Sequence, residues 1–538
     1  MARETTEAVE VNEAANETLE EEEEILEEEE EEVKVKGPSG ISLALNKFFH
    51  HLDRGTTMKS EIGAGLGAFC IAVCALMMNT QIIGSAYGNY AGSYLAVALI
   101  CFIGSLLLGI LCNLPLVMTA NMGLSAVLIS MLGTDTGLTY ANLMAVTFVA
   151  AIIYLVIVVT PLKQFFVDAL PEGVRKALPV GIGIYVMLTA LENSGLLTAD
   201  GALATASDFT TLQTYYFWLM IGATFLFILM KATGRKKPAF ATFGLLIAAM
   251  WVGGVLFYMN YFVGGQTAST IVYERLNVVV ATDGANPYNL ATGIASLNIG
   301  ALFTEGFDFS AYTEAGGSVP MFFLQGVLTF LFLGLYTNLG NTRAAAVVGG
   351  YEDEDYAVKG EQKALVVSAA LNVAAPVLGA SPTAVGTQSS VDTEDGGKTG
   401  LSSVAASLGF LVALFAWIFT LLFATKTNGA GMWVSETETK LAYYVQDAYV
   451  FADLIMVLVG ASMLKGIRKV DTAKLAEMLP FAAAVVGIGL LSNIAVGVAL
   501  GAISYVIVMA VSKERKNLTA GNLVLAVCML VYLILALI

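Results

Sequence analysis

The sequence predicts an all-α polytopic membrane protein, and two observations predict it: composition and the length of the apolar segments. Of the 538 residues, 57% are hydrophobic and 13% are charged, with a mean hydropathy of +0.74. Soluble domains carry roughly twice that share of charged residues. Many apolar runs reach the length of about 20 residues that a helix needs to cross a bilayer. The composition therefore excludes an ordinary soluble protein.

The net charge of −17 comes almost entirely from the start of the chain. Residues 1–33 contain 16 glutamates and one arginine, a net charge of −15, which leaves −2 for the other 505 residues. Such a run has no apolar face to bury, so we expect residues 1–44 to be an acidic, disordered cytoplasmic tail. A solvated tail and a regulatory or partner-binding tail are both open. We expect no cleaved signal peptide, because no basic region precedes an apolar core.

Fourteen segments of the remaining chain have the composition of membrane spans, and the third and tenth are short and polar. They lie near 62–83, 91–111, 115–131, 141–160, 174–192, 213–231, 238–260, 320–342, 363–379, 384–394, 399–424, 445–465, 475–493 and 495–512. They form a first seven-helix repeat at 45–260 and a second at 319–512, with a loop at 261–318 between them. The C-terminal apolar segment occupies 513–538, and its stretch 519–538 either crosses the membrane again or lies at its interface.

Lysine and arginine clusters predict the orientation of these spans. The clusters precede the first span and follow the fourth, sixth, eighth, twelfth and fourteenth, which places all of them on the N-terminal side. The loop at 261–318 has Arg275 as its only basic residue. We therefore expect a cytoplasmic N-terminus and an extracellular loop. An odd number of spans in each repeat gives the two repeats opposite orientations.

The third and tenth spans occupy matching positions in the two repeats. They contain CNLPLVMTANMGLSAVLISML and SPTAVGTQSSVDTEDGG. Irregular polar backbone at membrane depth is stable only where it is packed in protein or lines a wet cavity. Paired interrupted segments indicate a transporter site at the bilayer midplane, where the N-termini of half-helices point at a polar or anionic ligand.

Several motifs in these segments resemble the nucleobase:cation symporter family of the xanthine/uracil permease superfamily, and in particular its AzgA-like purine permease branch. The motif that opens the family's first span resembles LDRGTTMKSEIGAGLGAF, and its NLP…GMGLNA pattern resembles NLPLVMTANMGLSA. The segment leading into its fifth span resembles TPLKQFFVDALPEGVRKALPVGIGIYVMLTALENSGL, and its GGRTGL resembles GGKTGL. The motifs occur in the family's order over nearly all of residues 45–512.

The resemblance implies a UraA-like fold of two interlocked inverted repeats. Spans 1–4 and 8–11 would form a core domain, and spans 5–7 and 12–14 a gate domain. Short strands in the third and tenth spans would flank the ligand. The implied activity is uptake of a nucleobase with a cation, usually the proton, by an elevator-type motion in a homodimer of the plasma membrane.

The chain departs from the family at its acidic positions. The family's eighth span carries a motif resembling VDLFDTxGTL, and this chain has LGLYTNLGNT there. Gly334 and Thr337 stand at the two acidic positions. Gln388 stands at the glutamate position of the AzgA-like branch, and Lys398 replaces the arginine of GGRTGL.

The candidate substrate-binding residues are mostly amides and hydroxyls of the interrupted spans. Gln388 offers an acceptor and two donors, the complement of a purine's amide edge, or ties the broken helix to its neighbour. Each other candidate has a structural alternative, such as capping free backbone groups or packing between helices. These candidates are Ser389, Thr387, Asn338, Tyr336 (which would stack on the base), Thr119, Asn121, Gly123 and Asn79.

Intramembrane acids are the natural proton carriers, and few are present. The candidates for cation coupling are Asp453, Asp392 and Glu394, each of which could instead be a charge at a span boundary. The cysteines and the two histidines show no metal-binding spacing. We predict no cofactor, no metal, no nucleic-acid partner and no enzymatic activity.

The resulting hypothesis is a secondary active transporter that imports purine-type nucleobases, of the hypoxanthine, adenine, guanine or xanthine class, by symport with a cation, for which H⁺ is expected and Na⁺ stays open. An uncoupled nucleobase facilitator is one alternative, because the acids of the eighth span are missing. A transporter of another small organic anion or heterocycle on the same fold is the other. A membrane-embedded enzyme is the least favoured class.

Overall fold

The computed structural model describes residues 40–87, 89–132, 137–193, 290–353, 357–415, 456–512 and 518–537. The chain divides into two compact units, Met1–Gly55 and Thr56–Ile538. In the first, helix α2 (Gly40–Phe49) leads into a turn in which the backbone N–H of Leu52 donates to Asn46 Oδ1 at 2.8 Å. The predicted acidic run at 1–33 and the spans at 213–231 and 238–260 lie outside the described residues.

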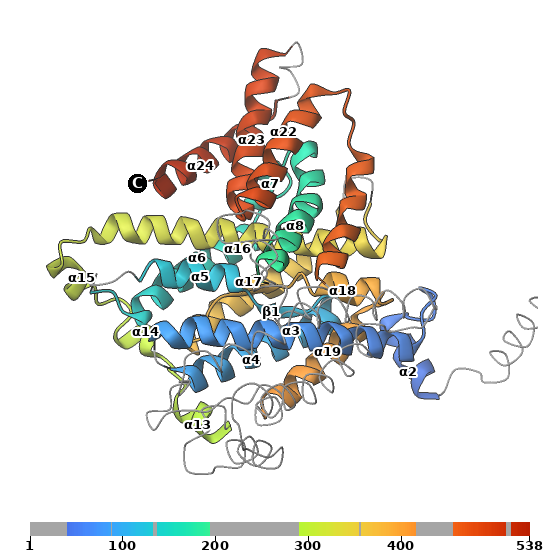
Figure 1. Cartoon of the computed structure of the whole chain (residues 1–538), viewed down its shortest axis with the longest axis horizontal. Coiled ribbons are helices and arrows are strands. Elements are labelled where there is room, and N and C mark those ends of the chain that lie inside the picture. Colours follow the sequence, from blue (N-terminus) through green and yellow to red (C-terminus); the bar gives the residue numbers. More distant parts are fainter. Residues whose placement is uncertain are drawn as a thin grey trace, which may run out of the picture. The chain divides into compact units, whose positions relative to one another are not determined.

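The second unit is mostly helical, as predicted, and its described helices fall into two contact groups joined by α16 (Figure 1). In the first group α19 packs along α3 and α4, and α6 packs between α17 and α16. This group comprises α3 (Met58–Tyr87), α4 (Tyr90–Leu107), the π-helix η1 (Leu108–Cys112), α5 (Met122–Ser130), α6 (Tyr140–Val159), α16 (Val319–Gly349), α17 (Glu361–Val377), α18 (Ser389–Glu394) and α19 (Gly400–Ala413).

The second group forms around α8, which packs against α22, η2 and η3. It comprises α8 (Glu172–Asn193), the 3₁₀-helix η2 (Leu464–Lys469), α22 (Leu475–Val485), the π-helix η3 (Val486–Leu490), α23 (Ile494–Val511) and α24 (Ala520–Leu537). Short helices lie between the long ones: α7 (Lys163–Phe166), α13 (Leu290–Ala295), α14 (Ala301–Thr304) and α15 (Ser310–Glu314). The long helix α16 contacts α6 and α18 in the first group and α8 and α23 in the second.

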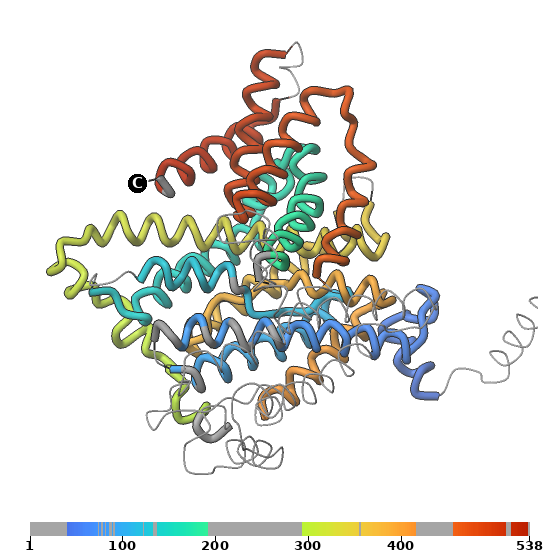
Figure 2. Tube along the Cα trace, viewed as in Figure 1, coloured from blue at the N-terminus to red at the C-terminus, as the bar shows by residue number. Residues whose placement is uncertain are grey.

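Segments from distant parts of the sequence are neighbours in the first group. The Cα trace shows α3 and α4, in blue, beside α19, in orange (Figure 2). The strands β1 (Met118–Ala120) and β2 (Thr383–Val385) pair in the same way, antiparallel, with Thr119 opposite Ala384. The short strands expected in the third and tenth spans are therefore confirmed, and the pairing brings the two interrupted segments together.

Five helices in the described part of the chain are long and apolar enough to cross a membrane. They are Gly92–Cys112, Tyr140–Val159, Glu172–Leu191, Val319–Gly349 and Ile494–Val511. Gly400–Ala413, Leu475–Leu490 and Ala520–Leu535 are shorter apolar helices. The chain is thus a multi-pass membrane protein, and the count of fourteen spans in two inverted repeats stays a prediction.

The apolar C-terminal segment forms a single helix, α24, in the described residues. It packs against α23, α16 and α7, burying Leu525, Met529 and Tyr532. The face with Val524, Val527 and Val531 is apolar and exposed. Such a face suits contact with lipid.

Candidate functional site

Side-chain amides complete the hydrogen bonds of strand β2. Asn372 on α17 holds Thr383 at both ends: its Nδ2 donates to the carbonyl at 2.8 Å and its Oδ1 accepts from the N–H at 3.1 Å. On α16, Asn338 Oδ1 accepts from the N–H of Val385 at 2.9 Å, and Asn341 Nδ2 donates to its carbonyl at 2.6 Å. The interrupted backbone is therefore satisfied by protein, as membrane depth requires.

Buried serines do the same for the segment that contains β1. Ser389 Oγ accepts from the N–H of Val117 at 2.9 Å. Ser403 Oγ accepts from the N–H of Leu116 at 2.8 Å. The backbone of Val117 also accepts from the N–H of Gly386 at 2.9 Å, which extends the pairing beyond the strands. Small polar residues of the tenth and eleventh spans thus fix the third span in place.

The NLP and GGKTGL motifs contact each other. Asn113 adopts a left-handed conformation with φ 50° after the π-helix η1. Its Oδ1 accepts from the N–H of Gly400 at 2.9 Å. A methyl group at position 400 would overlap the carbonyl of Gly109, so only glycine permits this approach of α19 to η1.

A cavity of about 120 Å³ opens beside the paired strands, where the two helix groups meet. Both groups contribute to its wall. The lining residues are Ala75, Thr119, Ala120, Asn121, Gly123, Leu124, Val127, Tyr185, Leu333, Thr337, Asn341, Gly386, Thr387, Gln388, Ser492, Asn493 and Ile494.

Five of the predicted substrate-binding residues lie on this wall: Thr119, Asn121, Gly123, Thr387 and Gln388. Thr119 Oγ1 donates to Gln388 Oε1 over 3.4 Å. Within the described residues the Gln388 amide nitrogen has no hydrogen-bond partner, so its donors are available to a ligand. Asn121 caps α5, with its Oδ1 accepting from the N–H of Leu124 at 2.9 Å, and so brings a helix N-terminus to the cavity.

The other predicted residues lie outside the lining set and have structural contacts. Ser389 is fully buried and holds Val117. Both polar atoms of Asn338 are engaged, since Nδ2 donates to the carbonyl of Gly334 at 2.8 Å and Oδ1 accepts from Val385. The contacts of Ser389 and Asn338 are therefore those of the structural alternative, in which the side chain satisfies backbone groups.

Asn79 and Tyr336 are also placed away from the cavity wall. Asn79 is fully buried, and its Nδ2 donates to Ser381 Oγ at 2.9 Å. Tyr336 is fully buried, and its hydroxyl donates to the carbonyl of Phe166 at 3.2 Å. Its ring stacks on Phe332 with centroids 6.3 Å apart. The face of the Tyr336 ring is therefore occupied by protein.

Sequence reasoning missed Thr337, Asn341, Tyr185 and Asn493, all of which line the cavity. Among the residues that the structure describes, Asn341 Oδ1 is buried with no hydrogen-bond partner, and such an acceptor at a cavity wall calls for a ligand or water. Asn493 caps α23, accepting from the N–H of Val496 at 3.1 Å. The signal for Asn493 was present, because an asparagine directly before an apolar run is a helix-capping pattern.

The cavity wall combines apolar and polar side chains and is uncharged. Of the lining residues none is Asp, Glu, Lys, Arg or His, and four are side-chain amides: Asn121, Asn341, Gln388 and Asn493. Amides and hydroxyls donate and accept hydrogen bonds without adding charge. An apolar cavity of about 150 Å³ holds one benzene ring. A cavity of about 120 Å³ is of that order, so a bicyclic ligand requires the wall to move outward.

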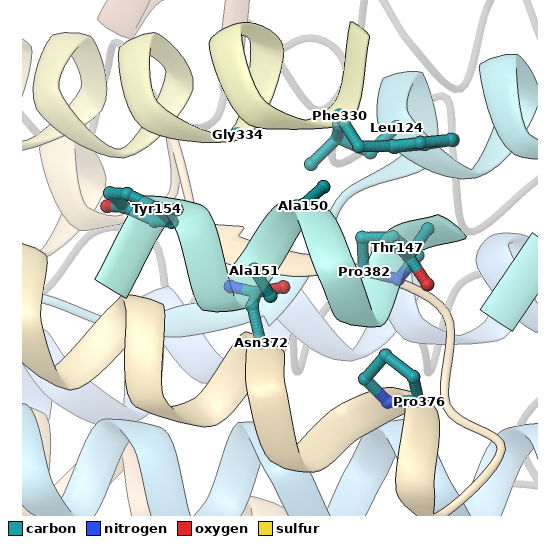
Figure 3. Close-up of a pocket in the computed structure, with 10 residues that line it drawn as sticks. All are labelled: Leu124, Thr147, Ala150, Ala151, Tyr154, Phe330, Gly334, Asn372, Pro376 and Pro382. Atoms are coloured by element: carbon teal, nitrogen blue, oxygen red, sulfur yellow. The ribbon is translucent and has the colours of Figure 1, made fainter. Parts of the chain in front are cut away.

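A second, smaller cavity of about 20 Å³ lies at Gly334, the first of the replaced acidic positions. Tyr154, Ala150 and Ala151 of α6 line it between α16 and α17, where Asn372 contributes its side chain (Figure 3). Its volume suffices for about one water molecule. A Cβ atom on Gly334 would meet no other atom within 4 Å.

The predicted cation-coupling acids are in different surroundings. Asp392 is fully buried in α18, one helical turn beyond Gln388. Glu394 is partly exposed, and Asp453 lies outside the described residues. Among the described residues no group of three or more His, Cys, Asp or Glu could hold a metal ion.

Comparison with known proteins gives purine permeases. No family model matches the chain. It is 25% identical over 494 residues to the guanine/hypoxanthine permease GhxP of Escherichia coli O157:H7, covering 91% of this chain and 96% of that one. It is 22% identical over 491 residues to the guanine/hypoxanthine permease PbuO of Bacillus subtilis (90% and 99%). It is 22% identical over 484 residues to the adenine permease AdeP of Escherichia coli K12 (90% and 94%).

Comparison with solved structures gives membrane transporters, and the two named below have TM-scores below 0.5. The transmembrane domain of the cyanobacterial bicarbonate transporter BicA has a TM-score of 0.42 at 16% identity, covering 89% of this chain and 96% of that one. The murine anion transporter Slc26a9 has a TM-score of 0.45 at 12% identity, covering 84% and 68%. The sequence relatives are permeases and not enzymes. They confirm that the chain resembles the nucleobase:cation symporter family, within the xanthine/uracil permease superfamily, along about nine-tenths of its length.

Proposed function

We propose that the protein is a transporter that carries a purine-type nucleobase, bound as an uncharged molecule, across the plasma membrane. The observation that carries this proposal is the uncharged, amide-lined cavity beside the paired strands. Relatives that match about nine-tenths of the chain are named as guanine/hypoxanthine and adenine permeases. The cavity and the relatives are independent supports, since one comes from geometry and the other from sequence.

Polar side chains of the cavity wall can form hydrogen bonds with the edge of a base. Gln388 offers the donors of its amide nitrogen, and Asn341 offers an unpaired acceptor. A ring amide, such as that of hypoxanthine or guanine, presents one acceptor beside one donor. We therefore propose that Gln388 donates to the ring carbonyl, while Asn341 Oδ1 accepts from a ring N–H.

The position of the cavity suits a core that moves against a gate. Gln388, Thr119 and Asn341 come from the first helix group, whereas Tyr185 and Asn493 come from the second. A shift of one group past the other would separate these walls and open the site. We propose this elevator-type motion, with a cytoplasmic N-terminus, as the way in which a purine larger than the closed cavity binds and leaves.

Cation symport, with H⁺ as the coupling ion, is part of the proposal. An uncoupled facilitator is the alternative, and a specific observation favours it: Gly334, Thr337 and Gln388 replace acids at the positions where the family carries them. Transport of an organic anion is disfavoured, because the lining residues include no cation to pair with it.

Uptake into proteoliposomes tests the proposal. The purified protein is reconstituted, and uptake of radiolabelled hypoxanthine, guanine, adenine, xanthine and uracil is measured with and without an inward proton gradient. We expect saturable uptake of at least one purine, and accumulation above equilibrium when the gradient is present. Equilibration independent of the gradient would select the facilitator. Failure to bind or exchange any of these bases would refute the assignment.

A further inference from the structure

Asp392 is buried one helical turn beyond the candidate ligand contact. Its side chain is fully inaccessible to solvent. Its backbone N–H donates to the carbonyl of Gln388 at 3.2 Å, so both residues lie on the same side of the short helix α18. Helix α18 packs between α16 and α3. The Asp392 carboxyl group is thus on the same short helix turn as Gln388, which lines the cavity, but Asp392 itself does not line it.

The hydrogen bonds around Asp392 suit a neutral carboxyl group. Ser402 Oγ lies 2.8 Å from Asp392 Oδ2 and 3.0 Å from the carbonyl of Thr399, and both of these atoms are acceptors when Asp392 is ionised. A serine hydroxyl has one hydrogen and can donate to only one of them. Both contacts are satisfied together only if Asp392 carries a proton on Oδ2 and donates it to Ser402, which then donates to Thr399.

The second carboxylate oxygen has no donor to stabilise a negative charge. Within the described residues Asp392 Oδ1 is buried and has no hydrogen-bond partner. It faces the backbone of Gly397, where an added methyl group would overlap it. A buried carboxylate with a single donor is costly, whereas its protonated form is not.

The charged groups that act on Asp392 are also acids, Glu61 and Asp395. Glu61 on α3 is fully buried, which disfavours its charged form, and the backbone N–H groups of Lys398 and Thr399, which donate to it at 3.0 and 3.3 Å, offset this only in part.

Helix α16, which packs against α18, carries the buried Arg343. The Nε and Nη2 atoms of Arg343 are held by Glu361 at 2.8 and 2.9 Å. Ionisation of Asp392 would therefore place a negative charge beside other buried acids, and among the described residues the charged groups that act on Asp392 include no cation.

We propose that Asp392 is the group that binds the proton carried with the nucleobase. This inference rests on the proposed nucleobase transport. The proton resides on Asp392 while Asp392 donates to Ser402, and its release turns the Ser402 hydroxyl toward Asp392 Oδ2. Because Asp392 and Gln388 share one turn of helix, this change is transmitted to the wall of the cavity.

Proteoliposomes that hold the full chain test the proposal with radiolabelled hypoxanthine, or with whichever purine the wild type exchanges best. The first assay measures exchange of internal for external base without a gradient. The second measures accumulation of base under a gradient of about two pH units. Such a gradient permits up to ~100-fold accumulation when one proton moves with each base. For Asp392→Asn we expect exchange within about 3-fold of the wild type but an accumulation ratio near 1. Asp392→Glu, which keeps a carboxyl group, should still accumulate the base.

A third variant keeps the test decisive if Asp392→Asn does not fold. Removing the donor in Ser402→Ala disfavours the charged carboxylate, so the pH of half-maximal uptake should move upward. An Asp392→Asn protein that accumulates base like the wild type overturns the proposal, and so does an unchanged pH profile in Ser402→Ala. A wild type that exchanges base but never accumulates it also overturns the proposal, whereas a wild type without any exchange refutes the transport function itself.

Discussion

The substitution Asn341→Ala tests whether an amide that holds the strand backbone also binds the ligand. The Asn341 side chain donates to the carbonyl of Val385 at 2.6 Å, and its Oδ1 is buried and unpaired. Removing the donor leaves a buried carbonyl unsatisfied, which costs about 1–3 kcal/mol of stability. Removing the acceptor costs the ligand one hydrogen bond, about 0.5–1.5 kcal/mol. The Kd for the base should therefore rise roughly 2- to 13-fold.

The neighbouring residue Asn338 provides a matched control. It accepts from the N–H of the same residue, Val385, at 2.9 Å, but it does not line the cavity. Asn338→Ala leaves that N–H unsatisfied and should lower stability by a similar amount, about 1–3 kcal/mol. Because no ligand contact is lost, its Kd should stay within about 2-fold of the wild type.

The assay measures the two effects separately on purified protein. The midpoint of thermal unfolding without ligand reports stability, recorded at one scan rate for all variants because membrane proteins often unfold irreversibly. Equilibrium binding of radiolabelled hypoxanthine reports the Kd. A wild-type Kd in Asn341→Ala, or an equal rise in Kd in both variants, would show that Asn341 acts only by holding the strand.

Three further substitutions test the site and the fold. Gly386→Ala would place a methyl group against Thr119 Oγ1 and Gln388 Oε1. This overpacking, which costs about 1–3 kcal/mol, should weaken hypoxanthine binding at least ~5-fold. Unchanged binding would contradict the geometry of the cavity wall. Gln388→Ala removes the donor to the ring carbonyl and should raise the Kd for hypoxanthine ~2- to 13-fold; normal uptake into proteoliposomes would rule out this contact. Gly400→Ala should lower the midpoint of thermal unfolding, because its methyl group overlaps Gly109 at a cost of ~1–3 kcal/mol. The Kd for hypoxanthine should change little. An unchanged midpoint would contradict the close approach of α19 to η1.

The location of the candidate cavity was predictable from the sequence, because polar residues at membrane depth usually satisfy interrupted backbone or line a wet cavity. The residues Thr119, Asn121 and Gln388 stand out as polar groups in two short segments flanked by apolar runs, and all three line the cavity. The same chemistry also satisfies interrupted backbone. Nothing in the sequence distinguishes Gln388, whose amide nitrogen has no partner among the described residues, from Asn338, whose two polar atoms are both engaged.

The choice of residues on α16 shows what the sequence leaves undetermined. Leu333, Thr337 and Asn341 line the cavity at intervals of four residues, one face of a helix. Asn338 is one position away from Thr337, which rotates its side chain by about 100° and turns it toward β2. The sequence identifies the helix, but its rotation is set by packing against α6 and α8, which no local pattern encodes.

The contribution of the second helix group was not predictable for a different reason. Tyr185 and Asn493 are far from the interrupted spans in sequence and reach the cavity only because α8 and η3 pack together near α16. The local sequence at Asn493 predicts a helix cap, and Asn493 does cap α23. Its second role depends on the tertiary arrangement of the two groups.

The separation between Asp392 and the cavity has a consequence that distinguishes this chain from a transporter with an acid in its binding site. The lining residues are uncharged, so the affinity for an uncharged base should not change while Asp392 titrates, apart from what the shared helical turn transmits. Net uptake requires the proton to bind and leave, so it should depend strongly on pH. We therefore expect the Kd for hypoxanthine in detergent to vary less than about 3-fold between pH 5.5 and 8, a coupling below ~1 kcal/mol, while accumulation in proteoliposomes falls as the external pH rises through the same range. A Kd that follows the same pH curve as accumulation would contradict this weak coupling, because it would show that protonation sets the affinity for the base itself.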